Sequence, residues 1–196
     1  MAHNFEQTLE KKHYFKVVRN LRLKRFIANG GVVAYPTESC FGLGCDPRNF
    51  RSIKKLNILK KRPANKNFIL ISSELEQNKG IVKEFNKKQI QMLYAKWPGP
   101  HTWLIRANAK CPSWLKSNGK VAVRIPDFNI CQDLISSIRM TITSTSANRT
   151  KQRPIKNYRE ACRHYSHGVH VVKGRIGKNK KPSQIQDFET KAIIRK

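Results

Sequence analysis

The chain has 196 residues, of which 39% are hydrophobic and 9% aromatic, so we expect one folded domain over residues 1–196. No apolar run approaches the roughly 18 residues of a membrane span, and the amino terminus lacks a basic segment followed by an apolar one, so we expect a cytoplasmic protein without a membrane partner. The 40 Lys and Arg against 12 Asp and Glu give a formal net charge of +28. Such a charge attracts polyanions such as RNA or nucleotides, while a composition rich in Lys, Asn and Ile along the whole chain explains it equally well.

The five cysteines are odd in number, and the sequence has no C-x-x-C pair. This pattern argues against a disulfide framework and against a zinc cage. We expect reduced thiols that are mostly buried.

The first predicted elements are a helix over 9–28, which ends at Asn29-Gly30, and a buried strand over 32–35. The strand is expected to end before Pro36, because proline has no N–H to donate to a strand ladder. A polar turn and a loop carrying Gly42 and Gly44 are expected next. Ligands bind at the carboxyl ends of strands in open α/β sheets, so this turn is the first candidate site.

Helices and strands alternate along the rest of the chain. The apolar pattern predicts helices over 50–60, 86–96, 129–138 and 158–164, and strands over 68–71, 102–106, 121–125, 140–144 and 169–172, with two short strands within 185–195. Alternation of this kind is typical of a single α/β domain with a largely mixed sheet.

Two polar clusters precede the middle of the chain. Thr37 and Ser39 offer hydroxyl groups beside rigid backbone, or they form an ordinary turn. Lys60, Arg62 and Lys66 form a cationic set that can grip a phosphate or carboxylate, since Arg donates two parallel hydrogen bonds and Lys supplies a point charge. The alternative role for this set is to satisfy the last carbonyls of the preceding helix.

The later clusters have two readings each. Trp97–Thr102 contains two prolines around a glycine, which fix a stiff bend. This bend has a purely structural role, or it forms part of a binding wall. Arg124 interrupts an apolar strand and needs an acidic side chain or an anionic substrate, because an unpaired buried charge is costly; the scarcity of acids favours the substrate. Thr143–Ser146 present hydroxyl donors after a strand, or form a polar turn. The Gly- and Lys-rich loop 174–183 closes over a nucleotide or is mobile.

Several common sites are not supported. The sequence has neither G-x-x-x-x-G-K-[ST] nor G-x-G-x-x-G, which excludes P-loop and Rossmann nucleotide sites, and it has no G-x-S-x-G elbow of a serine hydrolase. His164, His167 and His170 straddle a predicted helix end and a strand, so we expect a surface cluster and no metal site.

Taken in order, these clusters resemble the YrdC/TsaC family, the threonylcarbamoyl-AMP synthases. The resemblance is carried by motifs spread over nearly the whole chain: Tyr35-Pro36-Thr37-Glu38, Phe41–Pro47, Lys60-x-Arg62-Pro63, Trp97-Pro98-Gly99-Pro100-x-Thr102, Val123-Arg124, Ser144–Asn148 and Pro182-Ser183. It implies a twisted α/β fold of the YrdC-like type with a concave basic cavity, in the short single-domain form.

The resemblance also implies a reaction, in which L-threonine, bicarbonate and ATP with Mg²⁺ give threonylcarbamoyl-AMP and pyrophosphate. No tightly bound cofactor is expected. Partner proteins then place the threonylcarbamoyl group on tRNA beside the anticodon, and direct tRNA binding is a further possibility. We expect charge stabilisation by fixed cations to be the main catalytic contribution, because several anions meet in one site.

Residue roles follow from the same resemblance. Lys60 and Arg62 are the expected catalytic cations; Thr37, Thr102 and Arg124 are expected to bind threonine or bicarbonate; and the expected nucleotide contacts are Lys66, Ser144, Ser146, Asn148 and Ser183. No residue stands out as a general base. Two alternatives remain: an RNA-binding module of the same fold without adenylate chemistry, and a carbamoyl-adenylate former for another acceptor.

Overall fold

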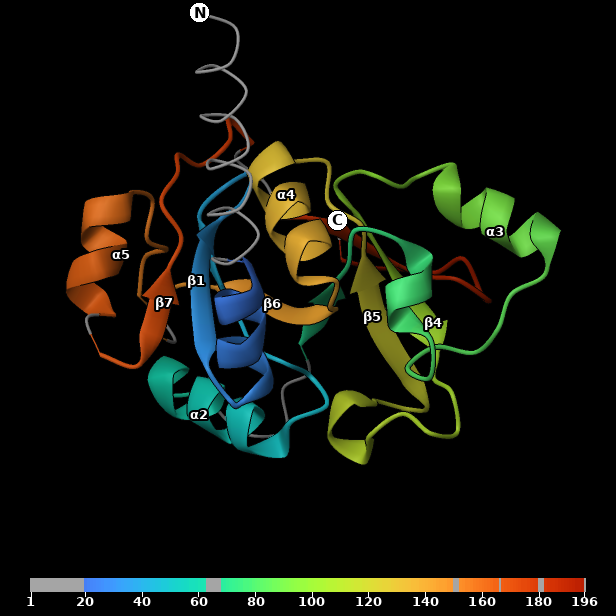
Figure 1. The fold of residues 1–196 in the computed structure, drawn as a ribbon. Coiled ribbons are helices and arrows are strands. Elements are labelled where there is room, and N and C mark those ends of the chain that lie inside the picture. Colours follow the sequence, from blue (N-terminus) through green and yellow to red (C-terminus); the bar gives the residue numbers. More distant parts are fainter. Residues whose placement is uncertain (1–19, 63–67, 150–151, 166, 180–181, 196) are drawn as a thin grey trace, which may run out of the picture.

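The computed structural model describes residues 20–62, 68–149, 152–165, 167–179 and 182–195. These residues form a mixed nine-stranded sheet with helices packed on it (Figure 1). The strands lie in the order β7-β1-β2-β6-β3-β5-β4-β8-β9. Their bounds are β1 Val32–Pro36, β2 Phe41–Gly44, β3 Ile69–Ile71, β4 His101–Arg106, β5 Lys120–Arg124, β6 Ile142–Ser146, β7 Val169–Val171, β8 Gln184–Asp187 and β9 Ile193–Arg195. The pairs β1–β7, β3–β5 and β4–β8 are parallel and the other neighbours antiparallel, which confirms the predicted mixed sheet.

The helices begin and end close to the predicted positions. Residues 20–28 are helical, and the longer expected helix over 9–28 otherwise lies outside the described residues. The others are α2 Phe50–Lys60, α3 Lys87–Tyr94, α4 Asn129–Ile138 and α5 Tyr158–His164, with short 3-10 turns η1 Leu75–Asn78 and η2 Ser113–Leu115. No helix in the described ranges has the length and apolar character needed to cross a membrane.

Strand β1 is buried on both faces, and its side chains alternate between two apolar clusters. Val33 and Tyr35 pack with α4 and with Ile27 of the first helix on one face. Val32 and Ala34 belong to the larger cluster on the other face, which includes side chains of α2 and α5. The two-residue period of the strand therefore buries β1 between these two apolar clusters.

Strand β2 was not predicted: its residues were expected to form a loop around Gly42 and Gly44. The prediction was wrong because two glycines in four residues lack the β-branched pattern of a strand. The backbone explains one of them, since a Cβ at Gly44 would lie 2.5 Å from the carbonyl oxygen of Thr143 on the neighbouring chain segment. Only glycine allows β2 to approach β6 so closely.

Strand β6 lies two residues later than predicted, over Ile142–Ser146 instead of 140–144. Its first part, Ile142–Ser144, pairs with β3, and its second part, Thr145–Ser146, pairs with β2. The hydroxyl residues that were expected to follow the strand are thus part of it. Because β6 changes its partner half-way, it joins the β7-β1-β2 side of the sheet to the side that ends in β9.

All five cysteines are free, and Cys45, Cys111 and Cys131 are buried. The expectation of reduced, mostly buried thiols is confirmed. Burial raises the pKa of the Cys45 thiol to about 12, which keeps this group neutral.

Candidate functional site

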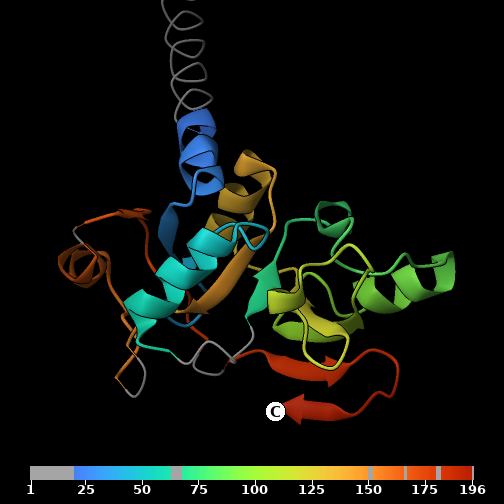
Figure 2. The same cartoon turned by 90° about the horizontal axis from the view of Figure 1, so that it is seen from below.

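A cavity of about 430 Å³ lies at the partner change of β6, between the turn after β1 and the C-terminal strands. Its lining includes side chains from distant parts of the sequence: Thr37, Ser39, Cys40, Arg62, Phe68, Arg124, Ser144, Thr145, Ser146, Pro182, Ser183, Ile194 and Arg195. A smaller recess of about 60 Å³ adjoins it, with Thr37, Ser39, Arg124, Ser144 and Ser183 in both linings. Seen from below, β8 and β9 (red) form one edge of the sheet (Figure 2).

The turn between β1 and β2 holds Thr37 at the cavity wall. The hydroxyl of Thr37 donates to the carbonyl oxygen of Cys40 at 2.7 Å, and its backbone N–H donates to the same oxygen at 2.9 Å. This double contact fixes the side chain in a tight turn, which agrees with the turn reading of Thr37. Thr37 also lines the cavity and the recess.

The loop after β7 closes on this turn. The N–H of Gly177 donates to the carbonyl oxygen of Thr37 at 2.9 Å, and the N–H of Asn179 donates to that of Glu38 at 3.1 Å. A Cβ at Gly177 would lie 2.7 Å from the Glu38 carbonyl oxygen, so glycine is needed for the contact. Asn179, Pro182 and Ser183 from this segment line the recess. Residues 180–181 of this segment lie outside the described residues.

Arg124, at the end of β5, bridges two loops. Its Nη2 forms an ion pair with Glu38, and its Nε donates to the carbonyl oxygen of Gly99 at 2.9 Å. Of the two partners that the sequence left open, the structure therefore supplies the acidic one, although acids are scarce. The guanidinium has five N–H donors, and its side chain lines both the cavity and the recess.

Lys60 is the last residue of α2 and is buried. Its ammonium group donates to the backbone carbonyls of Ser146 and of Asn148, the latter at 2.8 Å. Burial, with a smaller contribution from the charge of Arg62, lowers the pKa of Lys60 to about 8. The Lys60 ammonium group thus connects the end of β6 to α2. It loses its proton at a lower pH than an exposed lysine does.

Arg62 lies two residues beyond α2 and lines the cavity. Its Nη1 donates to the hydroxyl of Thr145 at 3.2 Å, and its guanidinium carbon lies 4.7 Å from the centre of the Phe68 ring. Burial lowers the pKa of Arg62, which still leaves it charged. Lys66, expected in the same cationic set, lies outside the described residues.

Ser144 and Ser146 of β6 line the cavity, together with Thr145, whose hydroxyl accepts from Arg62. Ser144 accepts a hydrogen bond from the Tyr35 hydroxyl at 2.9 Å, and Ser146 donates to Oδ1 of Asn148 at 2.5 Å. Asn148 itself is held by Lys60, and its side-chain amide donates to the carbonyl of Gln152. Ser144 and Ser146 are therefore cavity residues, and Asn148 supports the strand end behind them.

Thr102 lies behind the cavity wall instead of lining it. Its side chain is fully buried, and its hydroxyl is 2.8 Å from that of Ser183, which does line the cavity. Thr102 can therefore act on a ligand through Ser183. The guanidinium of Arg195 donates twice to the Ser183 carbonyl, at 3.0 and 2.7 Å.

Arg195 and the pairing role of Glu38 were not predicted from the sequence. Arg195 lies in β9 and lines the cavity, where burial lowers its pKa. Glu38 stands beside Thr37 in the turn and was not assigned a role. The available signal was the rule used for Arg124: a charged residue within an apolar segment needs a partner. That rule did not say which partner the fold would bring near.

Within the part of the chain that the structure describes, no three His, Cys, Asp or Glu side chains are arranged to hold a metal ion. His164 instead contacts the carbonyl oxygen of Glu160 in its own helix, at 3.3 Å from Nδ1.

The family model Sua5_yciO_yrdC, described as "Telomere recombination", matches residues 25–196. The chain belongs to the Sua5/YciO/YrdC family. Among curated Sua5/YciO/YrdC relatives, the threonylcarbamoyl-AMP synthase of Methylobacillus flagellatus is 42% identical over 179 residues, which cover 91% of this chain and 99% of that protein. The threonylcarbamoyl-AMP synthase of Neisseria gonorrhoeae is 40% identical, over 89% of this chain and 93% of that protein.

Solved structures of the Sua5/YciO/YrdC family have the same fold. P. abyssi Sua5, crystallised in complex with L-threonine, superimposes with a TM-score of 0.77 at 25% identity; the match covers 87% of this chain and 51% of that one. E. coli YciO gives a TM-score of 0.75 at 19% identity, over 92% of this chain and 89% of that one. This chain therefore spans about half of the Sua5 polypeptide and most of YciO. The predicted family and fold class are confirmed.

Proposed function

We propose that this protein is an L-threonylcarbamoyladenylate synthase, a nucleotidyltransferase that makes threonylcarbamoyl-AMP from L-threonine, bicarbonate and ATP. The observation that carries the proposal is a single cavity into which the Thr37 turn, Arg62, the β6 hydroxyls and Ser183 all project. The curated relatives of similar length, which are threonylcarbamoyl-AMP synthases, support it. So does the likeness to a Sua5 crystallised with L-threonine.

The reaction needs two bonds to form in turn. The amine nitrogen of threonine bonds to the carbon of bicarbonate, which gives a carbamate and releases water. A carbamate oxygen then attacks the α-phosphorus of ATP, and the bond to the oxygen bridging the β-phosphorus breaks, so that pyrophosphate leaves. Both steps bring anions together, and fixed cations lower their barriers by stabilising the developing charge.

We assign the cavity residues to these steps. Thr37 binds threonine in the recess, and Arg124 holds the threonine carboxylate with the N–H groups that do not contact Glu38 or Gly99. Ser144 was predicted to bind the nucleotide, but we assign it to threonine because it lines the same recess as Thr37. Arg62 binds the phosphates and the carbamate, where two parallel hydrogen bonds suit either anion. Holding the three reactants in one cavity supplies the positional part of the catalysis.

Lys60 acts on the same anions from behind β6, and Ser146 and Ser183 bind the nucleotide. Asn148 supports Ser146 from the end of the strand, and Thr102 supports Ser183. Lys66 remains a proposed phosphate contact on the sequence argument alone.

ATP enters with Mg²⁺ in this proposal. Mg²⁺ usually keeps several waters and binds substrate phosphates with one or two carboxylates. Glu38 is a carboxylate in the recess lining, and its ion pair with Arg124 leaves phosphate oxygens as the main ligands. The product then passes, in the cytoplasm, to partner proteins that modify tRNA beside the anticodon.

The test is synthesis by the purified protein with ATP, threonine, bicarbonate and Mg²⁺. We expect pyrophosphate together with a threonylcarbamoyl-adenylate identified by its mass. Arg62→Ala should abolish both products without changing the folded state, while Arg159→Ala, which alters an exposed arginine of α5, should retain them. A folded wild-type protein that makes neither product, even with the tRNA-modification partners added, would overturn the proposal.

A further inference from the structure

Two aromatic rings stand together on the surface, away from the cavity. Phe50 begins α2 and Trp114 lies in η2, and their ring centres are 5.0 Å apart with the planes at 44°. Phe50 is 45% exposed and Trp114 37% exposed. The indole N–H donates to the carbonyl oxygen of Pro47 at 3.0 Å, which fixes the ring in place. Exposed aromatic side chains held this firmly are suited to stacking with a flat ligand.

Positive charge surrounds the two rings. Lys54 places its ammonium group 4.7 Å from the centre of the Phe50 ring, and Arg51 is exposed on the same helix. Among the described residues, no ion pair neutralises Arg51 or Lys54. The acid next to them in sequence, Asp46, accepts the backbone N–H of Arg48. We call Phe50, Trp114, Arg51 and Lys54 the aromatic platform.

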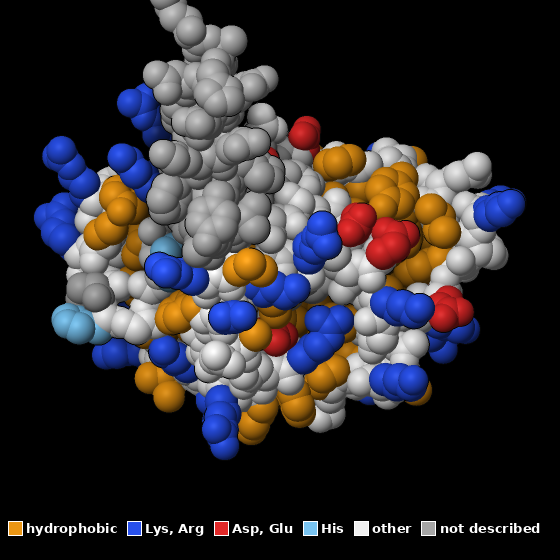
Figure 3. Space-filling view, viewed as in Figure 1, with side chains coloured by type: hydrophobic (Ala, Val, Ile, Leu, Met, Phe, Trp, Pro, Cys, Tyr) orange, Lys and Arg blue, Asp and Glu red, His pale blue; other side chains and the backbone are white. Residues whose placement is uncertain are grey.

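Other parts of the protein surface are basic as well. Figure 3 shows Lys and Arg spread over the visible face, while Asp and Glu are few and gather mostly on its right-hand side. Figures 1 and 2 place α2 and the turn over 113–115 on the underside of the molecule. A net charge of +28 draws any polyanion to the protein, whereas stacked rings distinguish a polyanion that has flat, unpaired bases.

We propose that the aromatic platform binds single-stranded RNA by stacking bases on Phe50 and Trp114 while Arg51 and Lys54 contact the phosphates. Proteins that bind single strands combine these two features, a cationic track and aromatic side chains on which successive bases stack. An acidic protein would be drawn by the charges but would leave the two rings without a flat partner. The choice of RNA over DNA rests on the proposed function, whose product is used on tRNA.

Phe50, Arg51 and Lys54 of the platform belong to the same helix as Lys60. Phe50 begins α2 and Lys60 ends it, so the helix separates them by about 15 Å. RNA on the platform would therefore lie near the cavity without entering it. This position allows RNA binding and adenylate synthesis to be measured independently.

The test uses an unstructured RNA 12-mer at several salt concentrations, without ATP or threonine. Trp97 and Trp103 are only 3% and 4% exposed, so we expect the RNA to quench the fluorescence of Trp114. The quench should disappear in Trp114→Phe, and affinity should fall about tenfold in the Phe50→Ala, Trp114→Ala double variant, since each stack contributes substantially to binding. Adenylate synthesis should be unchanged in both variants. A duplex RNA should bind equally well to wild type and double variant.

A charge-matched pair of variants separates the platform from general attraction and does not depend on removing a ring. Arg51→Glu with Lys54→Glu should weaken binding about tenfold more than Lys87→Glu with Lys88→Glu, which changes two exposed lysines of α3 by the same charge. Equal losses in the two pairs would overturn the proposal, because binding would then follow net charge alone. Equal competition by polyglutamate without a quench would overturn it as well.

Discussion

Arg124 and Glu38 form an ion pair that connects the end of β5 to the turn after β1. The arginine also donates to the carbonyl oxygen of Gly99, so one guanidinium holds two loops of the cavity wall. Glu38→Gln keeps the shape of the side chain but leaves the arginine without its counter-charge. We expect the free energy of unfolding in urea to fall by about 3 kcal/mol, as for other broken buried pairs.

The control for this substitution is Glu76→Gln, which changes an exposed carboxylate of η1. It should alter the free energy of unfolding by less than about 0.5 kcal/mol. Equal effects of the two substitutions would mean that the Glu38 pair adds nothing to stability.

The pKa of Lys60 predicts an alkaline limit to activity. Burial lowers this pKa from 10.5 to about 8, so the ammonium group loses its proton at a lower pH than an exposed lysine does. We expect kcat/KM to fall as the pH rises through about 8, because that parameter reports the free enzyme. Lys60→Arg, which stays charged, should give a slower enzyme whose profile lacks this fall. A fall that persists in the variant would assign it to another group.

Gly177 allows the loop after β7 to contact the turn after β1. In Gly177→Ala the new Cβ would lie 2.7 Å from the Glu38 carbonyl oxygen, so the loop must move and its hydrogen bond to Thr37 is lost. We expect the KM for threonine to rise about tenfold or more, since small displacements of positioning groups are costly. Thermal denaturation should change little, because the segment is at the surface.

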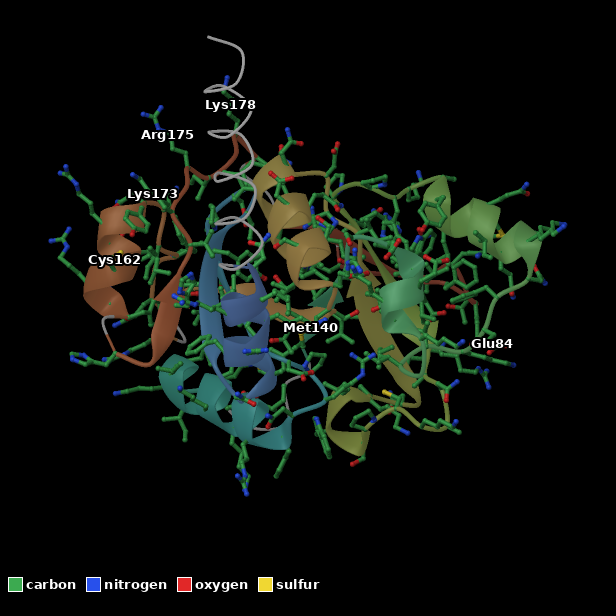
Figure 4. The ribbon with its side chains drawn as sticks, in the orientation of Figure 1. Glu84, Met140, Cys162, Lys173, Arg175 and Lys178 are labelled. Carbon is green, nitrogen blue, oxygen red and sulfur yellow. The ribbon has the colours of Figure 1, made fainter. Side chains whose placement is uncertain are left out.

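Arg175→Ala is the matched control in the same loop. Figure 4 shows that the Arg175 side chain points away from the body of the protein. Its removal should leave the KM for threonine unchanged. An equal rise in both variants would show that any change in this loop has the same effect.

Thr102 and Ser183 share a hydrogen bond but occupy different positions relative to the cavity. Thr102→Val removes a fully buried hydroxyl, so we expect the free energy of unfolding to fall by about 1–2 kcal/mol. Because Thr102 acts on the nucleotide only through Ser183, the KM for ATP should rise by no more than about twofold. Ser183→Ala removes the hydroxyl that faces the cavity and should raise the KM for ATP about tenfold. The same KM in both variants would contradict this division of roles.

Local sequence patterns were sufficient to predict the bounds of the helices whose ends depend on neighbouring residues. The helix α2 begins after Asn49, whose side chain accepts N–H groups of the first turn, and it lies over Phe50–Lys60 as predicted. The helices α4 and α5 likewise have their predicted bounds. In each case the apolar spacing and the turn residues at the ends are visible within a dozen residues of sequence.

Features that depend on distant segments were not predictable in this way. Strand β2 forms because β1 and β6 lie on either side of it, and its glycines matter only once β6 is close. The pairing of Arg124 with Glu38 joins residues 86 positions apart, and Arg195 reaches the cavity only because β8 pairs with β4. The order of the motifs predicted residues that lie in or next to the cavity. Which of these side chains line the cavity depends on the fold.

The change of partner along β6 has a mechanical consequence. The Thr37 turn belongs to the half of the sheet that contains β1 and β2. Ser183 directly precedes β8 and Arg195 lies in β9, and both strands belong to the other half. A ligand in the cavity is therefore expected to contact both halves of the sheet and to connect them across β6. We expect substrates to slow amide hydrogen exchange at the two ends of β6 together, as one cooperative unit, even where the backbone itself touches no ligand.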